Sequence, residues 1–424
     1  MYTNHRIGLC GLLLSVVFIS SSVQAKVDDT ALTLIEAQYL ALQNEPGIQA
    51  RLLRARALID QSVADSQLPD PKLILGIQNL PTDSFDLDQE AMTQLRLGIR
   101  QQIPRGDSLS IKGDIGRTKS AVWRLESEIR RRKVKLDVGM LWLDSAYWQE
   151  YIQTLDQDRY LFEQLIEVTE SLYSLGRKDQ EDVLRAQLEL SKLEQKRLIA
   201  SENINVSHDS LSQWIGVTQA QRPTATMYST RRKDLQRTTK GIHALEKHPE
   251  VLRLSSELQI SRDRIKLAEE AYKPQFGVEL GYGFRADGDT DRSNLMSAMV
   301  TLDMPLFSGN RQDRRLSAEQ YRALAVEEER QALMRKLQAK TTSLRSRWAF
   351  LDQQIEHYKT SLLPQAEQQA EAALSAYQSD VGDFADVMQG YITVLNTKLE
   401  FLRVSVEKNR VGEQLSYYLP VTAI

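Results

Sequence analysis

The segment QFGVELGYGFR, residues 275–285, alternates strictly between two kinds of residue. Its even-numbered positions are large and apolar, whereas its odd-numbered positions are polar or glycine. Because successive side chains of a β-strand point to opposite faces, this pattern predicts a strand with one apolar face and one polar, glycine-rich face. A second alternating segment, residues 295–304, follows a polar loop and completes a predicted β-hairpin.

The first half of the chain contains a similar hairpin, with strands predicted at about residues 72–80 and 92–103. Four amphipathic strands are too few to close a membrane barrel, because the open edges would leave backbone groups unpaired in hydrocarbon. Two chains would give eight strands and a plugged lumen, whereas three would give twelve and an open one. The polar, glycine-spaced faces favour three chains. These faces are predicted to line the lumen with four charged residues: Arg96, Arg100, Glu279 and Asp303.

The whole chain is an internal duplication. Glu45-Pro46 recurs as His248-Pro249 at an offset of 203 (248 − 45), and Asp182 recurs as Asp386 at an offset of 204 (386 − 182). A repeat this long indicates a duplicated half-molecule rather than a solenoid. The predicted regions are a signal peptide at 1–25, a first structural repeat at 26–216, an inter-repeat connector at 217–234 and a second structural repeat at 235–424.

Each repeat is predicted to contain two helices before its hairpin and two after it. The first opens at Leu32 or Leu235, and the second begins at Pro46 or Pro249, since proline at a first helical turn costs no hydrogen bond. Long helices follow the hairpins, because proline and glycine are nearly absent there and apolar residues recur at spacings of three and four. These stretches are residues 119–175 and 310–381.

The long helices are predicted to turn sharply at Gly176 and Gly382, after which helices run back. Each returning helix, together with the helix before the hairpin, approaches the long helix in length, so each repeat is predicted to form two parallel rods. Pro364 interrupts the second long helix and predicts a kink, whereas Tyr160 occupies the aligned place in the first.

Composition and motifs exclude several classes of function. The chain has 54 basic and 57 acidic residues, which gives no electrostatic argument for nucleic-acid binding. Its only cysteine, Cys10, lies in the predicted signal peptide, so no disulfide is expected. No apolar run outside that segment is long enough for a transmembrane helix. Without nucleotide-binding, nucleophile or metal-ligand motifs, neither an enzyme nor a cofactor or metal is predicted.

The order of motifs over both copies resembles the TolC-type outer-membrane efflux proteins. The resemblance rests on the opening segment Leu32–Ala37, the Ile103-Pro104 turn after a strand, and the spacing of Tyr377 and Asp386. It implies a mainly α fold with a membrane β-barrel. The protein would be a homotrimer in the cell outer membrane, in which each chain contributes four strands to a 12-stranded barrel. A long coiled-coil α-barrel would extend from that barrel into the periplasm.

The resemblance also implies a function and partners. The trimer would be a passive exit duct that receives substrates from an inner-membrane pump of the RND type through a periplasmic adaptor (membrane fusion) protein. The segment Leu68–Pro71 and the short connector after Gly216 resemble the corresponding segments of family members that serve heavy-metal pumps. Drug efflux and type I secretion stay open as alternatives. Two other classes of protein are alternatives to a channel: a periplasmic adaptor and a non-channel structural coiled-coil protein of the envelope.

The resemblance places functional residues at the ends of the helices. Asp386 could form part of an acidic gate, or it could stabilise a helix N-terminus, as Asp182 would. The candidates for the periplasmic gate are Tyr377, Asp386 and Gln389. The candidates for adaptor contact are Leu175, Gly176, Arg177, Lys178, Asp380, Val381, Gly382 and Asp383.

Overall fold

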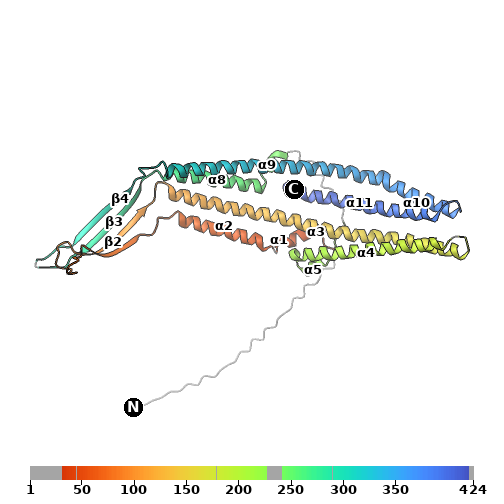
Figure 1. Cartoon of the computed structure of the whole chain (residues 1–424), viewed down its shortest axis with the longest axis horizontal. Helices are drawn as coiled ribbons and strands as arrows, with labels where there is room; N and C mark the ends of the chain where they lie inside the picture. Colours follow the sequence, from red (N-terminus) through yellow and green to blue (C-terminus); the bar gives the residue numbers. More distant parts are fainter. Residues whose placement is uncertain (1–30, 44, 178, 227–240, 289, 420–424) are drawn as a thin grey trace, which may run out of the picture.

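The molecule is elongated, with a β-sheet at one end and two helical hairpin turns at the other (Figure 1). This computed structural model describes residues 31–43, 45–177, 179–226, 241–288 and 290–419. The predicted signal peptide lies outside the described residues. The mainly helical fold with a small strand domain confirms the predicted class.

The two halves contain the same order of helices and strands. The first half consists of α1 (Leu34–Gln43), α2 (Pro46–Asp65), β1 (Lys72–Gln78), β2 (Gln94–Ile103), α3 (Ser108–Ser174), α4 (Gln180–Ile215) and α5 (Val217–Ala220). The second half consists of α7 (Gly241–Glu246), α8 (Pro249–Glu270), β3 (Gln275–Phe284), β4 (Leu295–Asp303), α9 (Gln312–His357), a π-helical turn (Tyr358–Leu362), α10 (Leu363–Gln378) and α11 (Phe384–Tyr418).

The first helix begins two residues later than predicted. Leu32 instead forms an isolated parallel β-bridge with Thr224, and the Trp142 indole donates a 2.8 Å hydrogen bond to its carbonyl oxygen. The Thr33 hydroxyl accepts a bond from the Glu36 amide and so satisfies one of the free donors of the first turn. The bridge ties the start of the described chain to the segment that follows α5. The corresponding helix of the second half is described only from Gly241.

The four strands form one antiparallel sheet in the order β1-β2-β3-β4. Its register sets apolar side chains opposite one another, as with Ile99, which faces Leu73 on one side and Leu280 on the other. Leu280 in turn faces Ala298. Because residues paired across strands share a face, the apolar alternation of each segment adds up to one continuous apolar face.

Each half forms two parallel rods, as predicted. The helices α2 and α4 pack along α3, and α8 and α11 pack along α9 and α10 (Figure 1). Together α2 and α4 have 56 residues (20 + 36), against 67 in α3. The long helix α3 also contacts α8 and α11, so it joins the two halves.

Buried side chains and one ion pair join the two halves near the helical turns. The Lys398 ammonium of α11 lies 2.8 Å from an Asp158 carboxylate oxygen of α3, and the Asp158 side chain is only 7% exposed. The surrounding buried cluster draws on α3, α4, α10 and α11, and comprises Leu155, Phe162, Leu165, Ala186, Leu193, Tyr377, Phe384, Val387, Met388, Leu395 and Leu399. The two hairpins therefore share one core rather than touching only at their surfaces.

Pro364 disturbs its helix, whereas α3 continues without interruption past Tyr160. The five residues Tyr358–Leu362 form a π-helical turn directly before the proline. A proline cannot donate the hydrogen bond of a helix interior, and a π-turn is one way to accommodate that loss.

The equivalent helices α2 and α8 are capped with different chemistry. In the first half Glu45 accepts a bond from the Gly47 amide and binds Arg130, whose guanidinium lies over Trp214. In the second half the His248 Nδ1 atom accepts from the Glu250 amide, and Nε2 lies 3.3 Å from the Tyr417 carbonyl oxygen. The N-terminus of α2 is thus capped by a carboxylate in an ion pair, whereas the equivalent N-terminus of α8 is capped by a neutral imidazole.

The imidazole of His248 makes the second junction sensitive to acid. Burial lowers its pKa from the usual 6.5, assisted by the positive charge of Arg132, while Glu250 and the Tyr417 carbonyl oppose the shift. The neutral tautomer satisfies both ring nitrogens. Protonation would place a proton on Nδ1, against the amide that it caps.

We expect the folded protein to lose stability as the pH falls below about 6.5. His248 then binds a proton in the unfolded chain but stays neutral in the folded chain, because its pKa is lower there. For one proton the slope is at most about 1.4 kcal/mol per pH unit. Thermal unfolding in detergent between pH 5 and pH 8 measures it. His248→Asn keeps a capping side chain and should flatten the pH profile. An equally steep profile in that variant would contradict the assignment.

Candidate functional site: the sheet faces and the helical turns

The apolar face of the sheet is exposed along its whole width. Its large side chains are each 39–78% exposed: Leu73, Leu75, Ile77, Leu95, Leu97, Ile99, Phe276, Val278, Leu280, Tyr282, Phe284, Met296, Val300 and Leu302. A contiguous apolar surface of this extent marks contact with a membrane or a protein partner. Among the described residues, no helix combines the length and apolar character needed to cross a bilayer.

The opposite face of the sheet, the polar sheet face, carries a cluster of two arginines and one glutamate. The Arg96 guanidinium lies 2.5 Å from one carboxylate oxygen of Glu279, and Arg100 lies 2.5 Å from the other. The Glu279 side chain is 3% exposed, whereas those of Arg96 and Arg100 are 23% and 46% exposed. The carboxylate is therefore covered by the two cations, which face the solvent.

Sequence reasoning placed these three residues on one face but did not foresee their direct contact. They come from strands 179 or more residues apart, joined only by the β2-β3 pairing. The fourth candidate, Asp303, faces Gln275 at the end of the sheet. It shares the polar sheet face but lies four residues along the strand from Met299, the residue opposite Glu279.

Glycines let polar side chains lie flat on this face. A Cβ atom added to Gly281 would stand 3.1 Å from the Arg96 Nε atom and 2.8 Å from the Ser297 hydroxyl. One added to Gly277 would overlap the Thr301 hydroxyl. The glycine pattern was visible in the sequence, but its role in seating the neighbouring strands' side chains was missed. Cross-strand register would have revealed it.

The two helical hairpins end in the same turn motif. At the end of α3 the Arg177 amide bonds to the Leu172 carbonyl, and at the end of α10 the Val381 amide bonds to the Ala376 carbonyl. Each motif requires one left-handed residue, which is Gly176 in the first turn and Asp380 in the second, with φ of 70° and 63°.

The predicted sharp turn lies at Gly382, between α10 and α11, but its left-handed residue is Asp380. Asp380 is the residue aligned with Gly176, at an offset of 204 (380 − 176). Gly382 has another role, since a Cβ atom there would lie 2.9 Å from the Tyr377 amide nitrogen. It permits the chain to pass close to the end of α10. Sequence reasoning located this turn but did not indicate which of its residues is left-handed.

We expect opposite effects from substitutions at the two left-handed positions. Gly176→Ala should destabilise its turn by about 1 kcal/mol, because the methyl group meets no neighbour and only backbone strain counts. Asp380→Gly should stabilise the second turn by about 0.5–1 kcal/mol. Hydrogen exchange of the amides in each turn measures both. Asp380→Asn controls for the lost charge, and a shift of both turns in the same direction would refute the assignment.

The adaptor-contact candidates lie on these two turns. Leu175 is 68% exposed and Val381 is 85% exposed. Asp383 caps α11, since its carboxylate accepts a 3.1 Å bond from the Ala385 amide. Arg177 is exposed as well, whereas Lys178 lies outside the described residues.

The three gate candidates do not lie together within one chain. Tyr377 is 2% exposed and packs its ring against Phe384, with 5.6 Å between the ring centroids. Burial raises its pKa to about 12, with help from the carboxylates of Asp182, Asp383 and Asp380. Asp386 and Gln389, by contrast, are exposed on the first turns of α11. Asp386 thus stands where a carboxylate also favours the helix dipole.

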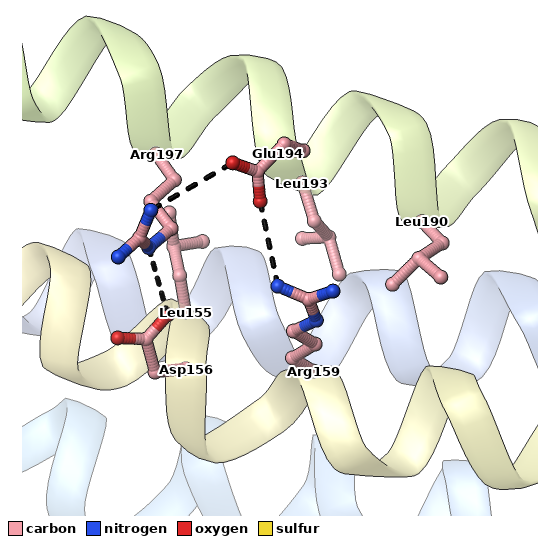
Figure 2. A pocket seen from close by; sticks show the side chains of 7 residues that line it. All are labelled: Leu155, Asp156, Arg159, Leu190, Leu193, Glu194 and Arg197. Carbon is pink, nitrogen blue, oxygen red and sulfur yellow. Dashed lines mark hydrogen bonds and ion pairs between the residues drawn. The ribbon is translucent and has the colours of Figure 1, made fainter.

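A small recess between α3 and α4 contains a chain of ion pairs (Figure 2). Arg197 contacts Asp156 at 3.2 Å and Glu194 at 3.7 Å, and Glu194 lies 3.5 Å from Arg159. The empty volume, about 200 Å³ including open solvent, is below that of ordinary ligand sites. These ion pairs stabilise the packing of α4 against α3. In the described residues no group of three or more potential metal ligands was found.

Comparison with known proteins agrees with this geometry. Residues 243–415 match the model of the family described as outer membrane efflux protein. No curated protein matches the sequence. Among solved structures, CusC is 12% identical, with a TM-score of 0.75 and coverage of 91% of each chain.

Two further channels have a similar fold. The outer membrane protein VceC of Vibrio cholerae is 16% identical, with a TM-score of 0.73 over 91% of this chain and 95% of that one. The MtrE outer membrane channel of Neisseria gonorrhoeae is 10% identical, with a TM-score of 0.70 over 91% and 88%. These likenesses show that the fold is that of solved outer-membrane channels. Residues 243–415 thus match the outer membrane efflux protein family, and the fold of the chain is similar to that of these solved structures.

Proposed function

We propose that the chain is the exit duct of a tripartite efflux system, passing substrates that an inner-membrane pump delivers through a periplasmic adaptor. The observation that carries the proposal is the sheet: its apolar face is exposed, its other face is polar, and its outer strands β1 and β4 each pair with only one described strand. Such edges invite pairing with another chain.

A homotrimer supplies the missing partners. Joining β4 of one chain to β1 of the next closes twelve strands into a barrel, with the apolar face toward lipid. The flat polar side chains over Gly277 and Gly281 support an open lumen rather than a plugged one. The rods, continuous with the sheet, would form a helical tunnel below it.

The helical turns are the proposed contact with the adaptor, through the exposed Leu175 and Val381. Asp386 and Gln389, one helical turn apart on the exposed side of α11, are the proposed gate residues. Three copies of Asp386 around a narrow mouth would repel one another and attract cations. Buried Tyr377 would instead hold the two hairpins of one chain together, and so oppose their separation.

For the cargo we favour heavy-metal ions delivered by an RND-type pump, on the strength of Leu68–Pro71 and the short connector after Gly216. Drug efflux and type I secretion are the alternatives. A deletion strain separates them, because loss of a metal duct sensitises cells to metal salts and leaves drug tolerance unchanged. Restoration of drug tolerance alone by the cloned gene would exclude the metal assignment.

The channel function is tested with purified protein. The mature chain should need detergent, run as a heat-resistant trimer on a gel, and conduct ions when added to planar lipid films. A structural coiled-coil protein would form no pore. A soluble monomer without conductance would overturn the proposal.

A further inference from the structure

The charges of the polar sheet face are unbalanced. One row of the sheet runs from Lys72 through Arg100 to Glu279, each facing the next across a strand pair. Arg96 also binds Glu279, so two arginines contact this carboxylate, and Lys72 lies beside Arg100 on the next strand. With Asp303 at the end of the sheet, the charged residues on this face of the described strands sum to one net positive charge (three cations less two carboxylates).

The arginines are held in place rather than free to sample solution. Both oxygens of Glu279 are engaged, and glycine at position 281 lets the Arg96 guanidinium lie flat against the sheet. Ion-paired arginines are fixed more firmly than single surface cations. The positive charge of the two arginines that Glu279 does not neutralise therefore stays close to Glu279 on the sheet.

We infer that Arg96, Arg100 and Lys72 form a positively charged ring that makes the barrel part of the lumen prefer anions, such as chloride or anionic groups on the cargo, whereas Asp386 at the tunnel mouth would attract cations. The inference rests on the proposed channel function, since three chains are needed to make the ring. A confined lumen with low-dielectric walls focuses the field of fixed charges and concentrates counter-ions. Nine cations against six carboxylates would face this lumen in a trimer, three times the composition of one chain.

The loop at the far end of the sheet has the opposite charge. It carries Asp83, Asp86, Asp88 and Glu90, which are exposed to solvent. Charges exposed to solvent are screened within about 8 Å at physiological ionic strength. The electrostatic effect of the loop on an ion in the lumen is therefore weaker than that of the confined ring.

The test measures the zero-current potential of the reconstituted mature protein across a tenfold KCl gradient. Arg100→Gln should lower the chloride-to-potassium permeability ratio at least about twofold, and Arg100→Lys should restore it. Glu279→Gln, which removes the negative charge, should raise the ratio. Arg292→Gln removes an equal charge from an outer loop and should change it less.

The outcomes separate the two proposals. If the unaltered protein forms no pore, the channel function fails and the charge ring with it. If the pore conducts but Arg100→Gln shifts the ratio no more than Arg292→Gln, the channel function stands and the ring is refuted. Should Arg100→Gln fail to assemble, the opposite shift expected from Glu279→Gln still decides the matter.

Discussion

Ile99→Arg is expected to abolish assembly of the trimer in the outer membrane. Ile99 lies in the middle of β2, is 49% exposed, and faces Leu73 and Leu280 on the apolar side of the sheet. An arginine at the lipid-facing midplane of a barrel costs about 2–4 kcal/mol, and a trimer would bear this cost three times. The measurement is the amount of heat-resistant trimer in isolated outer membranes.

The control places the same side chain on the other face. Gln102→Arg, three residues along β2, adds the charge to the polar sheet face opposite Gly277, where water solvates it. Trimer yield should stay near that of the unaltered protein. If Ile99→Arg assembled as well as Gln102→Arg, the apolar face would not be in contact with lipid.

Lys398→Met is expected to destabilise the folded chain by about 3–5 kcal/mol, because it leaves the carboxylate of Asp158 buried without its cation. The two residues belong to different halves, so the effect reports on the junction between them. Denaturant unfolding of the detergent-solubilised protein measures the change in free energy.

Two variants show whether the buried charge is the cause. Asp158→Asn combined with Lys398→Met removes both charges and should recover most of the loss. Lys192→Met breaks the pair with Glu189 at a site where the lysine is 56% exposed, and should cost under about 1 kcal/mol. A loss in the double variant equal to that of Lys398→Met would point to packing rather than charge.

The strands and long helices could be predicted because the spacing of apolar residues in the local sequence differs between strand and helix. Alternation around Phe276 and Tyr282 decides which residues share a face, and the near-absence of proline and glycine between 119 and 175 permits a long helix. Local patterns also located the proline-led starts of α2 and α8. They do not specify where a left-handed residue falls, since aspartate can also occupy that conformation, at a higher cost than glycine.

Contacts between distant residues could not be predicted in this way. Asp158 and Lys398 are 240 residues apart, and nothing around either one marks it as half of a buried pair. The same holds for the burial of Tyr377, which was grouped with Asp386 by spacing alone. A single sequence gives the face of each helix but not the rotation of one helix against another, and that rotation separates buried Tyr377 from exposed Asp386.

The π-helical turn before Pro364 has a consequence for docking stoichiometry. In a ring of three chains, hairpins with an unbroken α3 alternate with hairpins whose outgoing helix is interrupted at Tyr358–Leu362. Six near-copies would then present two unequal classes of landing site. A partner that distinguishes them binds three to a ring, whereas one that tolerates both binds six, in two populations of different affinity.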